Sequence, residues 1–207
     1  MKRILFLFFT LFFFKRTVFG QNSVDARILL RATTSVAGGE YFIDILPQYV
    51  STKIIFKLKN RMRQFELEAD TNTIRYRHIL DSVKNFNPNN DTVKTYLEKL
   101  DLIYLAYTLY DTDSIIVLNN ENKNYVKLIQ EVLKSPTEVL ENKNHIVLDG
   151  TRMNFILTNN DIIRTVYAHS PTSTSNPILY KLITETTSLY RKNKMNNFLS
   201  EKRTNGY

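Results

Sequence analysis

Three histidines, His78, His145 and His169, are the side chains whose ordinary pKa suits general acid–base chemistry near neutral pH. None has a second histidine three or four residues away, so the spacing predicts no metal site and no cofactor. We expect His145 and His169 on strands that flank one central strand, on either side of it. A hydrolase assembled from dispersed residues would therefore have His145, His169 and Glu185 as its candidate catalytic residues.

Carboxylates alternate with apolar residues after position 64. Glu66, Glu68 and Asp70 would share one face of a strand, and a pair of carboxylates at such spacing is what a glycosidase uses. One of the two must then sit in an apolar pocket that holds its proton. The complete alternation favours a solvated sheet face instead.

A hairpin would place these acids opposite lysines of the preceding segment. With loop residues 60–63, Lys57 would face Glu66 and Lys59 would face Gln64. Opposite charges across a hairpin stabilise the pairing, so this arrangement predicts a structural role. A functional site for a polyanion would leave the lysines without acidic partners.

Tyrosine is the other abundant side chain with binding chemistry, since it combines a large apolar ring with a polar tip. The chain has twelve tyrosines and no cysteine, which excludes disulfides and thiol chemistry. A binding cluster of Tyr41, Tyr49, Tyr167 or Tyr180 requires that the fold bring those segments together. Otherwise these residues serve the core. Nothing matches a phosphate-binding glycine loop, a nucleophile elbow or a zincin helix.

The first twenty residues have the layout of a secretory signal peptide. Lys2 and Arg3 precede an apolar run, residues 4–14, which is too short to span a membrane. Cleavage is expected after Gly20, with an uncleaved N-terminal anchor as the alternative. The leader holds four of the 28 basic residues and none of the 20 acidic ones, so the mature net charge is +4. This modest charge favours solubility over nucleic-acid binding.

Periodicity along the rest of the chain predicts an α+β fold. An antiparallel sheet of about six or seven strands is expected, built from an N-terminal and a C-terminal meander, with three to four helices mainly on one face. The domains are a signal peptide (1–20), one α+β domain (21–191) and a mobile basic tail (192–207). The predicted strands are 24–31, 41–47, 54–58, 65–69, 114–118, 145–148, 151–158 and 162–169, and the predicted helices are 74–83, a buried 91–110, 124–134 and one that starts at Pro177 after an Asn176 cap.

These features together predict a periplasmic or secreted protein that is not an enzyme. We expect a partner that is another protein or an envelope macromolecule, bound as an inhibitor, an immunity protein or an accessory factor would bind it. We expect no nucleic-acid partner and no stable membrane insertion after cleavage. A secreted hydrolase is the alternative.

Overall fold

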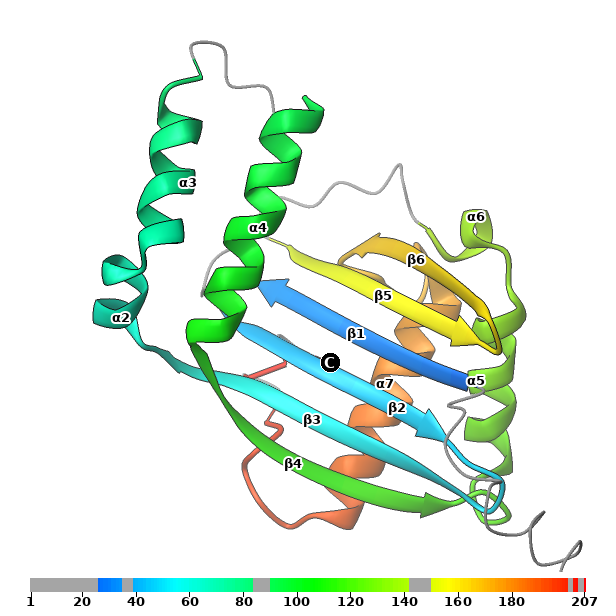
Figure 1. Ribbon diagram of the computed structural model, residues 1–207. Helices are drawn as coiled ribbons and strands as arrows, with labels where there is room; N and C mark the ends of the chain where they lie inside the picture. The colour runs from blue at the N-terminus through cyan, green and yellow to red at the C-terminus, as the bar shows by residue number, and fades with distance from the viewer. Residues whose placement is uncertain (1–25, 35–38, 84–89, 142–149, 201–202, 205–206) are drawn as a thin grey trace, which may run out of the picture.

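Six strands form one antiparallel sheet in the computed structural model (Figure 1), which describes residues 26–34, 39–83, 90–141, 150–200, 203–204 and 207. The strand order is β4-β3-β2-β1-β5-β6. The strands are β1 (Ala26–Thr34), β2 (Glu40–Pro47), β3 (Ser51–Met62), β4 (Thr108–Leu118), β5 (Thr151–Asn159) and β6 (Ile162–His169). The helices of the described residues are α2 (Gln64–Ala69), α3 (Thr71–Asp81), α4 (Asp91–Tyr107), α5 (Lys123–Lys134), α6 (Thr137–Leu140) and α7 (Pro177–Asn193). The α+β class and the antiparallel sheet are confirmed, with more helices than the expected three to four. The proposed signal peptide and His145 lie outside the described residues.

The two predicted meanders join into one sheet through β1. Strand β1 pairs with β2 on one edge and with β5 on the other, where Ala26 lies opposite Asn159 and Thr34 opposite Thr151. Strand β5 also pairs with β6, so both of its edges are occupied over its length. The predicted strand 145–148 lies outside the described residues.

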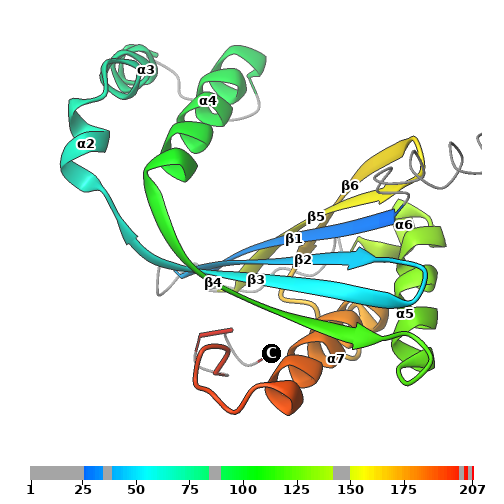
Figure 2. The same ribbon diagram turned by 60° about the horizontal axis from the view of Figure 1, so that its bottom comes forward.

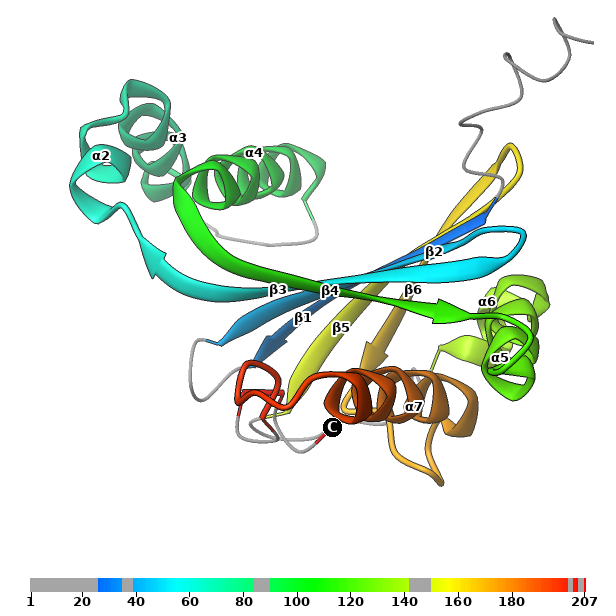
Figure 3. The same ribbon diagram turned by 90° about the horizontal axis from the view of Figure 1, so that it is seen from below.

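One face of the sheet carries the hydrophobic core, and α5 and α7 cover it (Figures 2 and 3). Alternate residues of each strand point into this core, among them Ile28, Phe56 and Phe155, each 0% exposed. The Phe56 ring meets Tyr190 of α7 edge-on at 4.8 Å between ring centroids. Both helices were predicted from their 3.6-residue periodicity, and the Asn176 cap of α7 is confirmed, since its side chain accepts a hydrogen bond from the Leu179 N–H.

The segment predicted as the strand 65–69 is instead helix α2. The two edges of β3 pair with β2 and β4, so no edge is left for a hairpin partner. Leu67 is buried, while Phe65 is 90% exposed, although both would share one face of a strand. The predicted pairing of Lys57 with Glu66 is therefore wrong.

Helices α2, α3 and α4 form an arm, residues 64–83 and 90–107, that lies between β3 and β4 in the chain and stands off the sheet (Figures 1 and 3). Only Val93 and Leu100 of α4 are buried, so the expectation of a buried helix is wrong. Asn90 caps it, and it ends at Tyr107 because the chain turns extended at Thr108 to start β4. Aromatic and cationic side chains share the surface of the arm, where the Lys99 Nζ lies 5.3 Å from the Tyr96 ring.

The chain after α7 folds back onto the core, in contrast to the expected mobile tail. Among its described residues, Leu199, Thr204 and Tyr207 are buried. The Tyr207 hydroxyl donates to the Pro171 carbonyl at 2.9 Å, and Arg191 donates to the Leu199 carbonyl at 3.0 Å. These contacts use single anchoring side chains, which is why periodicity did not reveal them.

Asp113 ties this segment to β4 and makes stability depend on pH. Its carboxylate accepts hydrogen bonds from the Tyr190 hydroxyl at 2.5 Å and from the Lys194 Nζ at 3.1 Å. The pKa of Asp113 is lowered from 3.8 to about 2, chiefly by the bond from Tyr190 and further by Lys194. A carboxyl group with a lowered folded-state pKa stabilises the fold above its ordinary pKa. This stabilisation is lost as the pH falls from about 4 to about 2.

We therefore expect the melting temperature of the wild type to fall more steeply than that of Asp113→Asn between about pH 4 and pH 2. Thermal unfolding followed by circular dichroism at a series of pH values measures both curves. Parallel curves for the two proteins would contradict the assigned role of Asp113.

Candidate functional site

The second face of the sheet, turned away from α5 and α7, is covered by neither helix (Figure 3). We call it the open face. The arm stands over one end of it, at the β3 and β4 side. The apolar and aromatic side chains on the open face are Leu29, Phe42, Leu46, Ile55, Tyr110, Ile116, Leu118, Ile156, Ile163 and Tyr167. Its charged side chains are Arg27, Arg31, Glu40, Asp44, Lys53, Lys57, Lys59 and Arg152.

Several of the apolar side chains on the open face are largely in contact with solvent. Ile116 is 65% exposed, Ile163 is 70% exposed and Tyr167 is 62% exposed. Ile156 is 37% exposed and lies directly opposite Leu29 of β1. Strands with one solvated face normally place polar residues there, so these apolar residues are atypical of a simple surface.

A cluster of four side chains, Arg31, Glu40, Asp101 and Tyr110, joins the arm to the sheet. We call it the latch. Arg31 of β1 donates to Glu40 of β2 at 2.5 Å and to both carboxylate oxygens of Asp101 on α4. The Tyr110 hydroxyl donates to the second oxygen of Glu40 at 2.9 Å. The Glu40 side chain is 8% exposed, so the latch includes one nearly buried carboxylate.

The latch raises the pKa of two of its members, Arg31 and Tyr110, so that each keeps its proton. The hydrogen bonds that Arg31 donates to Asp101 and Glu40 raise the pKa of Arg31, against the lowering effect of burial. Burial, and next the hydrogen bond to Glu40, raise the pKa of Tyr110. Arg31 thus stays a cation and Tyr110 stays a neutral donor at physiological pH. This arrangement fixes geometry rather than supplying a group that exchanges protons.

Three lysines of β3, Lys53, Lys57 and Lys59, form a row along the open face that we call the lysine row. Alternate residues of a strand share a face, which places all three on the same side. Among the described residues, none of these lysines makes an ion pair or a side-chain hydrogen bond. The lysines therefore lack the acidic partners that the predicted hairpin supplied.

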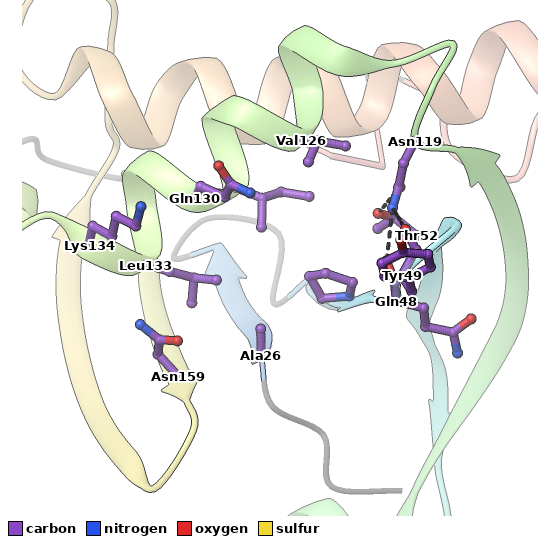
Figure 4. A pocket seen from close by; sticks show the side chains of 12 residues that line it. Ala26, Gln48, Tyr49, Thr52, Asn119, Val126, Gln130, Leu133, Lys134 and Asn159 are labelled. Atoms are coloured by element: carbon purple, nitrogen blue, oxygen red, sulfur yellow. Dashed lines mark hydrogen bonds between the residues drawn. The ribbon is translucent and has the colours of Figure 1, made fainter. Parts of the chain in front are cut away.

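A cavity of about 380 Å³ lies at the opposite end of the sheet, between α5 and the ends of β1, β2 and β5 (Figure 4). Val126, Ile129 and Leu133 of α5 supply apolar lining. Asn119 is held in place, because its side-chain NH₂ donates to the Gln48 carbonyl at 2.8 Å. The full lining of the cavity is Ala26, Pro47, Gln48, Tyr49, Thr52, Asn119, Val126, Ile129, Gln130, Leu133, Lys134 and Asn159. These side chains offer hydrogen bonds and one cation but no carboxylate or imidazole for proton transfer.

The candidate catalytic residues are not brought together within the described chain. His169 ends β6 and lies opposite Arg152. Glu185 is exposed on α7, the helix that covers the other face of the sheet. His78 is exposed on α3, in the arm. Among the described residues, no three His, Asp or Glu side chains are placed to hold a metal ion.

The four tyrosines proposed as a binding cluster are also dispersed. Tyr41 is buried in the core, Tyr49 is fully exposed at the cavity, and Tyr180 packs near Tyr207 at 6.2 Å between ring centroids. Only Tyr167 belongs to the open face. No helix within the described residues is long and apolar enough to cross a membrane.

The chain was compared with protein-family models, with curated proteins and with solved structures, and none of them matches it. No relative assigns a role to any residue. The features of this chain that bear on function are the open face, the latch and the lysine row.

Proposed function

We propose that this protein binds another protein through the open face of its sheet and acts without catalysis. The observation that carries the proposal is a sheet face that α5 and α7 leave uncovered and on which Ile156, Ile163 and Tyr167 are exposed. Burying apolar surface drives most protein association, and aromatic and aliphatic anchors supply much of its energy.

The size of the open face supports this proposal. Six strands about 4.8 Å apart span about 24 Å, and eight residues of strand extend about 26 Å. The resulting area of about 600 Å² approaches the roughly 800 Å² that each partner contributes to a typical stable interface. The side of the arm that faces the sheet can supply the remainder.

Export is part of the same proposal. The basic residues Lys2 and Arg3, the apolar run and Gly20 support cleavage that leaves Gln21 as the mature N-terminus. The partner would then be met in the periplasm or outside the cell. Mass spectrometry of the protein from fractionated native cells measures the terminus, and an intact Met1 in the membrane fraction would contradict cleavage.

Affinity capture from the envelope fraction of native cells tests the docking surface. We expect wild-type protein to retain a partner that Ile156→Asp retains at least about tenfold less, because a charge would be buried in the interface. Val139→Asp is the matched control, since Val139 is 56% exposed on α6, a helix outside the open face. Circular dichroism establishes that both variants are folded. Equal capture by the two variants would show that the open face is not the docking surface.

A further inference from the structure

We infer that the partner presents an acidic protein surface to the lysine row of β3, an inference that rests on the proposed function. The row consists of Lys53, Lys57 and Lys59, with Ile55 between the first two. It lies near the edge of the sheet, one strand in from β4 and on the side where the arm stands (Figure 1).

The strand register leaves no acid directly opposite Lys53 or Lys57, and its continuation by one residue brings Glu40 of β2 opposite Lys59. Lys57 lies between Phe42 of β2 and Thr112 of β4, and Lys59 lies opposite Tyr110. The same register places Lys53 between two apolar residues, one on each neighbouring strand. The charges of Lys53 and Lys57 are consequently not neutralised across the sheet.

The two acids of the open face are already engaged by arginines. Asp44 accepts two hydrogen bonds from Arg27, both 2.8 Å long. Glu40 accepts from Arg31 and Tyr110 within the latch. Neither carboxylate is free to turn towards the lysine row, so the face as a whole carries excess positive charge.

The spacing of the row makes an acidic partner favourable. Lys57 and Lys59 are two residues apart on one strand, about 6.6–6.8 Å, where like charges repel each other in the free protein. Carboxylates brought close to them relieve that repulsion and gain attraction. Such pairing also accelerates encounter at low ionic strength.

The apolar residues beside the lysine row favour a protein as the partner over a uniformly charged polymer. Ile55 lies within the row, and Leu46, Phe42 and Ile116 lie beside it. A sulphated polysaccharide or a nucleic acid would set charged groups against these side chains. A protein surface can place carboxylates over the lysines and apolar side chains between them.

The test compares two full-length triple variants with equal change of charge. Lys53→Glu/Lys57→Glu/Lys59→Glu alters the lysine row, and the control Lys127→Glu/Lys181→Glu/Lys192→Glu alters exposed lysines of α5 and α7. The readout is the amount of the protein that wild type captures and Ile156→Asp does not. We expect the first variant to capture at least tenfold less and the control to stay within twofold of wild type. We also expect wild-type capture to fall between 50 and 500 mM NaCl, roughly as screening predicts.

Three results would overturn the inference. Equal capture by the two triple variants, with Ile156→Asp still inactive, would mean that a protein docks but is not recognised by its acidity, which leaves the proposed function standing. Equal capture by all variants, Ile156→Asp included, would remove the proposed function itself. If fluorescein-labelled heparin binds wild type in the same lysine-dependent way and no protein is captured, the occupant is a polysaccharide.

Discussion

Replacing Phe155 with alanine is expected to lower the free energy of unfolding by about 3–5 kcal/mol, the usual cost of removing a fully buried aromatic ring. Phe155 is 0% exposed and points into the core covered by α5 and α7. Urea denaturation followed by circular dichroism measures this change.

The neighbouring residue provides a matched control for the same strand. Ile156 points to the open face and is 37% exposed, so Ile156→Ala is expected to cost less than about 1.5 kcal/mol. The contrast between two adjacent residues tests whether only one face of the sheet is core. Equal losses at the two positions would mean that the open face is buried in the folded protein.

Replacing Arg31 with alanine is expected to cost about 1–3 kcal/mol and to loosen the arm. The substitution leaves the Glu40 carboxylate, 8% exposed, without its cationic partner and cuts the link to Asp101. Removing one partner of a buried ion pair costs about 3–5 kcal/mol, and the 27% exposure of Arg31 reduces that figure. Amide hydrogen exchange is expected to become faster in α4 while the core strands stay protected.

Asp101→Asn weakens the link between Arg31 and the arm but does not take the buried Glu40 carboxylate away from Arg31. Asp101 is 46% exposed, and Glu40 keeps Arg31 in this variant, so the loss of stability is expected to stay below about 1 kcal/mol. Exchange in α4 should still rise. Unchanged exchange in both variants would show that the latch does not position the arm.

The elements that the sequence predicted well have an unambiguous period. Strands β1, β2 and β3 alternate strictly, and α5 and α7 carry apolar stripes every three to four residues. Such patterns reflect burial of one face, and burial is what fixes these elements.

The arm is the part of the fold whose structure differs most from the pattern of the sequence. Phe65, Leu67 and Ala69 alternate as a strand would, yet six residues are too few to separate a period of 2 from one of 3.6. Both edges of β3 are occupied, so the segment 65–69 has no edge to pair with. One of these edges is occupied by β4, which begins 46 residues after Met62. The second half of helix α4 is apolar almost all round, but its partners are the other helices of the arm and not the core.

The apolar character of the open face is visible in the sequence, but alternation alone did not reveal it. Leu29, Phe42 and Ile55 occupy outward positions in strands whose neighbouring residues point into the core. Apolar residues at positions that are usually polar indicate a surface that binds a partner. The isolation of the lysine row could not be inferred, because it depends on strand register across β2, β3 and β4.

Site-specific photo-crosslinking in native cells tests the docking claim most directly. A benzophenone side chain at Tyr167 lies on the open face, and one at Met195, 105% exposed after α7, lies away from it. We expect one discrete protein adduct from position 167 and none from position 195. No adduct at position 167, or the same adduct at both positions, would contradict the assignment of the open face as the partner-binding surface.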